Sequence, residues 1–227
     1  MPENPRTYVI IGCGRFGSGA AEKLLQKDPR PRIIVVDRSK SALRKVSQLP
    51  VASEVCDGTL YLEQFLSKGR KTDYIIPSVP FHLAFEFILS QFKPWGGKRI
   101  KVPSLPGLPN PIIGKAGDLY TSLADFLCPE DCPEPSQYCT ITKQRRLKPL
   151  YRILEGMKGH FESCVIRSRQ LAPGVGGYSP EGLLDLSENI KKRMAPRRTI
   201  LISTSCRCHG VTSALSFSPS KKSRATH

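Results

Sequence analysis

The sequence contains no apolar run that approaches the ~18–20 residues a membrane-spanning helix requires, so it predicts no membrane span. It also lacks an apolar stretch at its start, where Met1 to Arg6 are mostly polar and lead directly into a strand-like segment. We therefore expect no signal peptide and a cytoplasmic protein.

Acidic residues are scarce. The chain has 19 Asp and Glu against 35 Lys and Arg, which gives a net charge of +16. Such a balance favours anionic partners such as nucleotides, nucleic acids or membrane surfaces. The basic clusters, however, are spread along the chain without the interleaved aromatic side chains of single-strand binding proteins. We interpret them as solvated surface rather than a nucleic-acid site; they cover 143–148, 191–198 and 221–224.

Common catalytic patterns are also missing, because no Tyr-x-x-x-Lys or clear acid–base pair indicates hydride transfer to an organic substrate. Cysteine, in contrast, is abundant, with 8 residues in a chain of 227. In a chain expected to be cytoplasmic, these thiols indicate metal or thiol chemistry more than disulfides.

The most informative stretch is a short apolar run, Tyr8 to Ile11, that leads into the pattern G-x-G-x-x-G. A helical pattern follows, and a second apolar run then ends in an acid at Asp37. The order strand, glycine turn, helix, strand, acid is the signature of a dinucleotide-binding Rossmann unit.

Each glycine has a distinct expected role in this unit. Gly12 permits the tight turn, Gly14 lets the backbone approach a pyrophosphate, and Gly17 allows close packing of helix and strand. The start of the helix, at Arg15 and Phe16, presents unpaired N–H groups to the phosphates. Cys13, inside the turn, is expected to face the same edge.

Asp37 lies at the end of the second strand, twenty residues past Gly17, where it is placed to accept hydrogen bonds from a ribose. An acid there favours NAD over NADP, although Arg38 and Lys40 are available for a 2′-phosphate if Asp37 turns aside. The alternative is a Rossmann scaffold with an empty or vestigial site. The predicted cofactor-binding residues are Gly12, Cys13, Gly14, Arg15, Phe16, Gly17, Asp37, Arg38 and Asp57.

Three segments together resemble the TrkA-N (RCK) nucleotide-binding domain of potassium-channel and transporter regulators: VIIGCGRFG at 9–17, IIVVD at 33–37 and VCDGTLYLEQFL at 55–66. The likeness covers residues 6–95 and matches Asp57 to an acid that follows the third strand in that family. It implies a regulatory module that senses NAD(H) or adenine nucleotides, in contact with a transporter or with a second copy of itself. The resemblance does not extend to the second half of the chain.

The expected fold class is α/β, a doubly wound and mostly parallel Rossmann sheet with a long insertion rich in proline and cysteine. Alternation of strands and helices resumes after the insertion, so we expect this last part to extend the same sheet. The predicted parts are a Rossmann half at 1–102, the insertion at 103–148, a C-terminal α/β part at 149–216 and a disordered basic tail at 217–227.

The cysteines form two clusters, C-x3-C-x6-C in the insertion and C-x-C-H further on. Neither has the C-x2-C spacing of common zinc fingers, but together they offer more ligands than zinc or an iron–sulfur cluster needs. A metal site, reactive thiols and no special role all remain open. The predicted metal ligands are Cys128, Cys132, Cys139, Cys206, Cys208 and His209.

If the C-terminal strands extend the first sheet in parallel, their ends share an edge with the glycine turn. The turn, the loop 173–177 and the cluster 206–209 then converge, and the insertion folds over them. The function predicted from the sequence is an NAD(H)-binding regulatory or redox-sensing protein with a cysteine-ligated centre. The alternatives are an NAD-dependent oxidoreductase and a zinc-clamped scaffold that binds nucleic acid.

Overall fold

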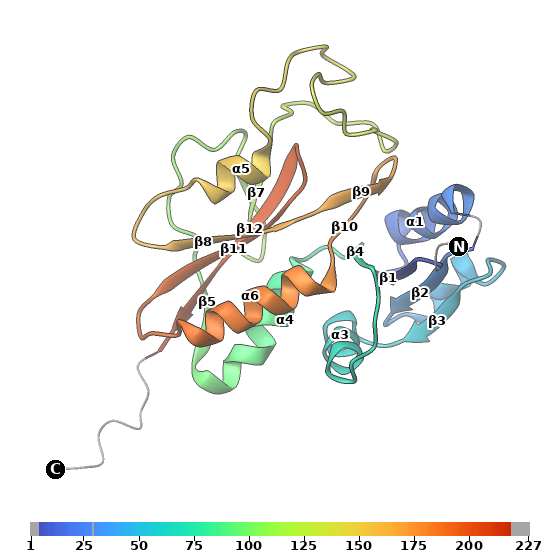
Figure 1. The fold of residues 1–227 in the computed structure, drawn as a ribbon, viewed down its shortest axis with the longest axis horizontal. Helices are drawn as coiled ribbons and strands as arrows, with labels where there is room; N and C mark the ends of the chain where they lie inside the picture. Colours follow the sequence, from blue (N-terminus) through green and yellow to red (C-terminus); the bar gives the residue numbers. More distant parts are fainter. Residues whose placement is uncertain (1–4, 29, 219–227) are drawn as a thin grey trace. The chain divides into compact units, whose positions relative to one another are not determined.

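A computed structural model describes residues 5–28 and 30–218, so most of the basic tail expected at 217–227 lies outside the described residues. Contacts divide the chain into two compact units (Figure 1). Unit 1 comprises 1–83, 128–146 and 168–182, and unit 2 comprises 84–127, 147–167 and 183–227. In the described part of the chain, no helix is both long and apolar enough to cross a membrane.

Unit 1 is built on a parallel sheet with the strand order β3-β2-β1-β4, which confirms the α/β class. Strand β1 is buried at four of its five positions, as expected for a parallel strand covered on both faces. The elements are β1 (Thr7–Ile11), α1 (Arg15–Lys27), β2 (Arg32–Asp37), α2 (Lys40–Leu43), η1 (Arg44–Val46), β3 (Ala52–Val55), α3 (Gly58–Ser67) and β4 (Tyr74–Pro77).

Two segments from the second half of the chain complete unit 1. One is the stretch 128–146, and the other carries a hairpin of β9 (Arg169–Ala172) and β10 (Val175–Gly177). The hairpin adjoins β4, because Ile75 and Tyr178 exchange backbone hydrogen bonds of 2.8 and 3.0 Å. Its residues Leu171, Ala172 and Val175 belong to the same apolar core as β1 and α1.

Unit 2 contains a second, mostly antiparallel sheet, with the order β6-β7-β12-β11-β8 and β5 also paired to β12. A core of leucines, valine and alanine joins this sheet to helix α5. The elements are α4 (Leu83–Phe92), η2 (Lys93–Trp95), β5 (Gly97–Ile100), β6 (Ile112–Ile113), β7 (Leu119–Ser122), α5 (Leu150–Glu155), β8 (Glu162–Arg167), α6 (Pro180–Lys192), β11 (Thr199–Ser205) and β12 (His209–Phe217).

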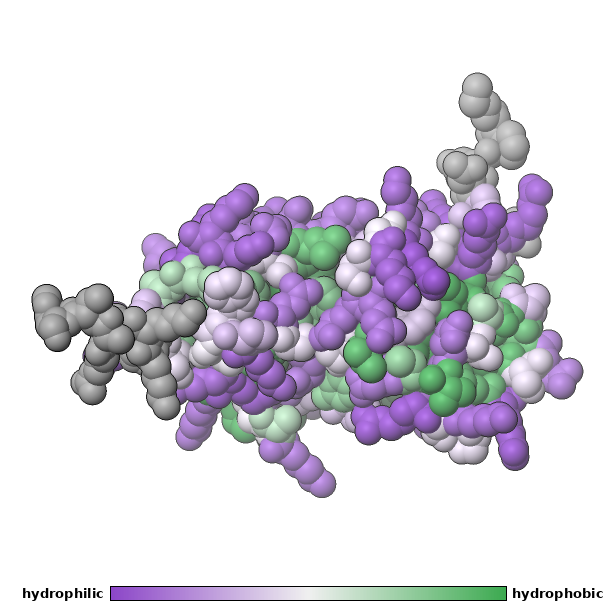
Figure 2. All heavy atoms as spheres, turned by 90° about the horizontal axis from the view of Figure 1, so that it is seen from below, coloured by the Kyte–Doolittle hydropathy of each residue, from purple (hydrophilic) through white to green (hydrophobic). Residues whose placement is uncertain are grey.

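The expectation that the C-terminal part extends the first sheet is therefore wrong. Strands β8 and β11 are parallel to each other, but they lie in the second sheet, where β11 pairs with β12 on its other side. No strand was expected at 209–217. Strand β12 occupies this stretch and forms the centre of the second sheet, with partners in β11, β7 and β5. Hydrophilic side chains cover much of the face seen in Figure 2, with apolar side chains gathered in smaller patches.

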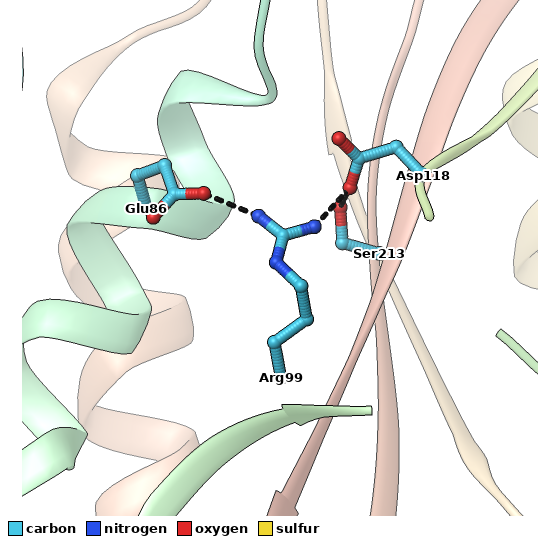
Figure 3. Close-up of polar contacts among 4 residues, drawn as sticks. All are labelled: Glu86, Arg99, Asp118 and Ser213. Carbon is cyan, nitrogen blue, oxygen red and sulfur yellow. Dashed lines mark hydrogen bonds and ion pairs between the residues drawn. The ribbon is translucent and has the colours of Figure 1, made fainter. Parts of the chain in front are cut away.

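A partly buried ionic network connects several elements of unit 2 (Figure 3). Arg99 on β5 donates hydrogen bonds to Glu86 on α4 and to Asp118, which precedes β7. The Asp118 side chain is only 1% exposed and also accepts a hydrogen bond from Ser213 on β12. The Arg99 guanidinium lies 4.4 Å from the centre of the Phe85 ring. Arg99 thus links β5 to α4 and to Asp118, which in turn is bonded to β12.

We predict that Arg99→Met destabilises the protein by about 3–5 kcal/mol, because the Asp118 carboxylate would stay buried without its cationic partner. The matched control is Arg152→Met, which breaks an exposed ion pair with Glu155 and should cost less than about 1 kcal/mol. Urea unfolding followed by circular dichroism measures both. Equal losses in the two variants would contradict the assigned role of the network.

Candidate dinucleotide site

The glycine turn between β1 and α1 excludes side chains at two positions. Gly12 has φ +100°, and a Cβ there would lie 2.4 Å from the Ser78 carbonyl oxygen. A Cβ on Gly17 would lie 1.9 Å from the Gly12 carbonyl oxygen, so α1 can approach β1 only if residue 17 is glycine. Both glycines therefore have the structural roles expected from the sequence.

Gly14 differs from these two, because beyond its chain neighbours no described atom lies within 4 Å of the position that a Cβ would take. Its φ of −72° suits any residue, so neither packing nor backbone strain in unit 1 requires glycine here. Gly14 is also the N-cap of α1 and has no side chain with which to cap the first N–H groups, and the first turn carries no acid. The open space and the uncapped helix start fit the phosphates of a dinucleotide.

Asp37 is aimed at this turn. Its Oδ2 accepts the Cys13 N–H at 2.7 Å, and its Oδ1 accepts the Ser39 N–H at 2.8 Å. The Gly12 N–H donates to the Val36 carbonyl at 2.7 Å, so the end of β2 fixes the turn through two neighbouring residues. A carboxylate oxygen accepts more than one hydrogen bond, and Asp37 therefore keeps acceptor capacity for ribose hydroxyls.

Cys13 does not face the ligand edge as expected. Its side chain is 0% exposed and lies in the apolar core of unit 1. Its backbone N–H is already bonded to Asp37. Burial and, to a smaller extent, the negative charge of Asp37 raise the pKa of the Cys13 thiol, which makes it an inert core residue.

Arg38 and Asp57 follow β2 and β3, respectively, and face each other across 3.9 Å. Asp57 Oδ1 also accepts the N–H groups of Thr59 and Leu60 at 3.0 and 3.1 Å, so it caps helix α3. The Arg38 side chain is 75% exposed and free to reorient. Phe16, the other residue predicted at the start of α1, has an exposed side chain.

No sequence pattern marks two residues that join α1 to other segments of unit 1, Glu130 and Lys23. Glu130, from the stretch 128–146, forms an ion pair with Arg15 on the first turn of α1. Lys23 Nζ donates to the carbonyls of Glu130 and Pro173 at 3.1 and 2.9 Å. In unit 1 the insertion therefore contacts the start of α1 through Glu130, and the loop 173–177 contacts Lys23 in the middle of the same helix. No local sequence pattern predicts the role of Glu130, because its partner Arg15 is more than a hundred residues away in the sequence.

The first cysteine cluster lies in the same stretch of unit 1. The Cys139 side chain is buried, and hydrogen bonds from the backbone of Thr142 and Ile141, together with Arg146, lower its pKa to about 6 against the opposing effect of burial. Burial raises the pKa of Cys128, and the neighbouring thiols Cys132 and Cys139 add to that rise. The Cys139 thiol is thus largely ionised at neutral pH.

The second cluster occupies the turn between β11 and β12, in unit 2. Cys206 Sγ accepts the backbone N–H groups of Cys208 and His209 at 3.4 and 3.3 Å, and lies 3.9 Å from His209 Nδ1. The Cys208 side chain, in contrast, is 3% exposed. Cys206 and His209 are therefore the pair that can act together.

The structure assigns the six predicted metal ligands to different units, three to each. Within residues 5–28 and 30–218, no three His, Cys, Asp or Glu side chains are placed to hold a metal ion. The cluster 206–209 was expected to converge with the glycine turn because both were placed at the edge of one sheet. The cluster belongs to unit 2 and the turn to unit 1, each with its own sheet, so that argument no longer applies. A metal role for either cluster stays a prediction.

Two families match successive parts of the chain. The AF_1314_C family, described as "Uncharacterized protein, C-terminal domain", matches residues 84–218, and the TrkA-N domain matches residues 8–67. An "Uncharacterized protein" of Archaeoglobus fulgidus is 32% identical over 221 residues, which cover 91% of this chain and 98% of that protein. The TrkA-N match confirms the resemblance seen in the sequence.

We predict that the thiolate absorbance near 240 nm shows a titration step at about pH 6, because that is the pKa of Cys139 in the folded protein. The step should vanish in Cys139→Ser and persist in Cys164→Ser, whose thiol has a pKa raised to about 12 by burial. Since unfolding returns the Cys139 pKa to about 9, stability should rise with pH between those values and fall as the pH drops through 6. A step that survives Cys139→Ser would contradict the assignment.

Proposed function

The chain belongs to the AF_1314_C family, and from that premise we propose that it is an NAD(H)-binding regulatory protein whose dinucleotide binds to the TrkA-N domain at 8–67. The single observation that carries the proposal is Gly14. It is a glycine where neither packing nor backbone conformation requires one, at the uncapped N-terminus of a 13-residue helix. A ligand that must touch the backbone explains that choice.

The charges around the turn support a dinucleotide. Arg15 brings a cation to the helix start, where the helix dipole already favours phosphate. Asp37 brings an acceptor to the end of β2, and its two bonds to backbone N–H groups hold it in the turn. Because Asp37 is fixed in this way, a 2′-phosphate would meet a carboxylate, and NAD is favoured over NADP.

A regulatory role is favoured over hydride transfer because the turn is accompanied by no acid–base pair in the sequence patterns described above. The partner that such a protein would regulate, a transporter or a second copy of the chain, stays a prediction, as does its cytoplasmic location. The AF_1314_C domain at 84–218 is the candidate for the effector part.

Thiol or metal chemistry is a second candidate function for unit 1. Three cysteines lie within the stretch 128–146, and that stretch contacts the start of α1 through Glu130. Zinc bound there would suit a sensor, whereas an iron–sulfur cluster would suit an oxidoreductase that passes electrons from NADH.

We predict that NAD binds more tightly than NADP, and that Gly14→Ala weakens NAD binding at least ~10-fold, because a methyl group would stand between the backbone and the pyrophosphate. Gly19→Ala is the matched control. It adds the same methyl group to α1 at another position with open space, and should leave affinity unchanged. Isothermal titration calorimetry measures both, with thermal unfolding as a check of folding. Equal affinities in the two variants would refute the proposed site.

For the second candidate, we expect protein purified without oxygen to contain zinc or iron that is lost in Cys132→Ser and kept in Cys164→Ser. Elemental analysis reads the metal, and a visible spectrum recorded during NADH titration reads its redox state. Iron that NADH bleaches would support the oxidoreductase, and zinc without NADH turnover would support the sensor. A metal-free protein would remove the metal hypothesis and leave the proposed NAD site untouched.

A further inference from the structure

The stretch 128–146, here called the cysteine segment, is fastened to unit 1 by its backbone. The Gly174 N–H donates to the Cys132 carbonyl at 3.2 Å, and Gln170 donates to the same carbonyl. Gly174 has φ +72°, and a Cβ there would lie 1.6 Å from the Glu130 carbonyl oxygen. The hairpin turn and the cysteine segment are therefore in direct backbone contact, which fixes the position of Glu130 and Cys132.

This attachment places the Glu130 side chain beside the start of α1. Its carboxylate pairs with Arg15, the first residue of the helix and the neighbour of Gly14. A carboxylate is the kind of group that an uncapped helix N-terminus attracts, and Arg15 completes the attraction. Glu130 is 52% exposed in this contact, so it can leave without the loss of buried structure.

We propose that Glu130 competes with the dinucleotide phosphates for Arg15, so that the cysteine segment is a strap whose hold on α1 weakens when the nucleotide binds. The inference rests on the proposed NAD site and adds its regulation. Lys23 and the bonds to the Cys132 carbonyl keep the strap attached at its base. Nucleotide binding therefore loosens the strap without releasing it.

The effect is reciprocal. If bound nucleotide weakens the contact between Glu130 and Arg15 by some factor, that contact must weaken nucleotide binding by the same factor, and a change that detaches Glu130 must therefore raise the affinity for the nucleotide. Cys128 and Cys132 lie two residues on either side of Glu130 and are partly buried. Chemical modification of either thiol would change the local backbone conformation that positions Glu130. The strap thus offers a route by which the state of these thiols and the nucleotide site influence each other.

The test compares Glu130→Gln with Asp131→Asn. Both variants remove one negative charge from exposed neighbouring residues, so long-range electrostatic effects are matched and only the contact with Arg15 differs. By calorimetry we expect Glu130→Gln to bind NAD about two- to fivefold more tightly, the range that an exposed ion pair contributes. Asp131→Asn should match the unmodified protein.

Two further measurements complete the test. In an Arg15→Met background, Glu130→Gln should have no effect on NAD affinity. NAD should also speed the reaction of Cys128, which lies outside the anchored base, with N-ethylmaleimide, read by peptide mass spectrometry, and leave Cys13 protected, because the core rather than the strap covers Cys13.

The outcomes separate the two proposals. NAD binding with equal affinity in Glu130→Gln and Asp131→Asn would overturn the strap and leave the NAD site standing. Failure of the unmodified protein to bind NAD would remove the site, and the strap with it. A Cys128 reaction rate that NAD does not change would likewise count against the strap.

Discussion

The close approach of α1 to β1 is the contact on which the rest of unit 1 depends. With 1.9 Å between the Gly12 carbonyl and the place where a Gly17 side chain would begin, no other residue fits at 17. This contact directs the uncapped end of the helix at the space beside Gly14. It also buries Cys13 under the turn and leaves Asp37 as the partner of the Cys13 N–H. One steric limit thus determines the positions of the helix N-terminus, the open space beside Gly14 and the Asp37 carboxylate.

The charges around the start of α1 determine which groups are attracted to it. The start of α1 carries Arg15 and no acid of its own, and the acid that it meets in the structure comes from the cysteine segment. The ion pair between Glu130 and Arg15 is therefore one that an anionic ligand at the turn would disturb. The ion pair of Arg99 with Asp118 in unit 2 differs, because the Asp118 carboxylate is buried and needs its cationic partner within the fold.

The first half of the fold was predictable because its signals are local. Gly12 to Gly17, Asp37 and the apolar runs around them fix a strand, a turn, a helix and a strand within a few dozen residues. The second sheet was not predictable in this way. Strand β12 pairs with β5, β7 and β11, and its sequence mixes buried serine and threonine with apolar residues, so no apolar run marks it. Glu130 and Lys23 were missed because their contacts join segments that are distant in the chain.

The division of the chain has a consequence for how this protein can be dissected or recombined. The chain passes between the two units five times, and both the cysteine segment and the hairpin of unit 1 lie within the stretch matched by the AF_1314_C family. A cut at residue 83, the obvious domain border by homology, would therefore yield a Rossmann fragment with β4 uncovered and without Leu171, Ala172 and Val175 of its core. The two matched regions therefore cannot be exchanged independently. A chain that kept residues 8–67 without the region 84–218 would lack part of the core of unit 1.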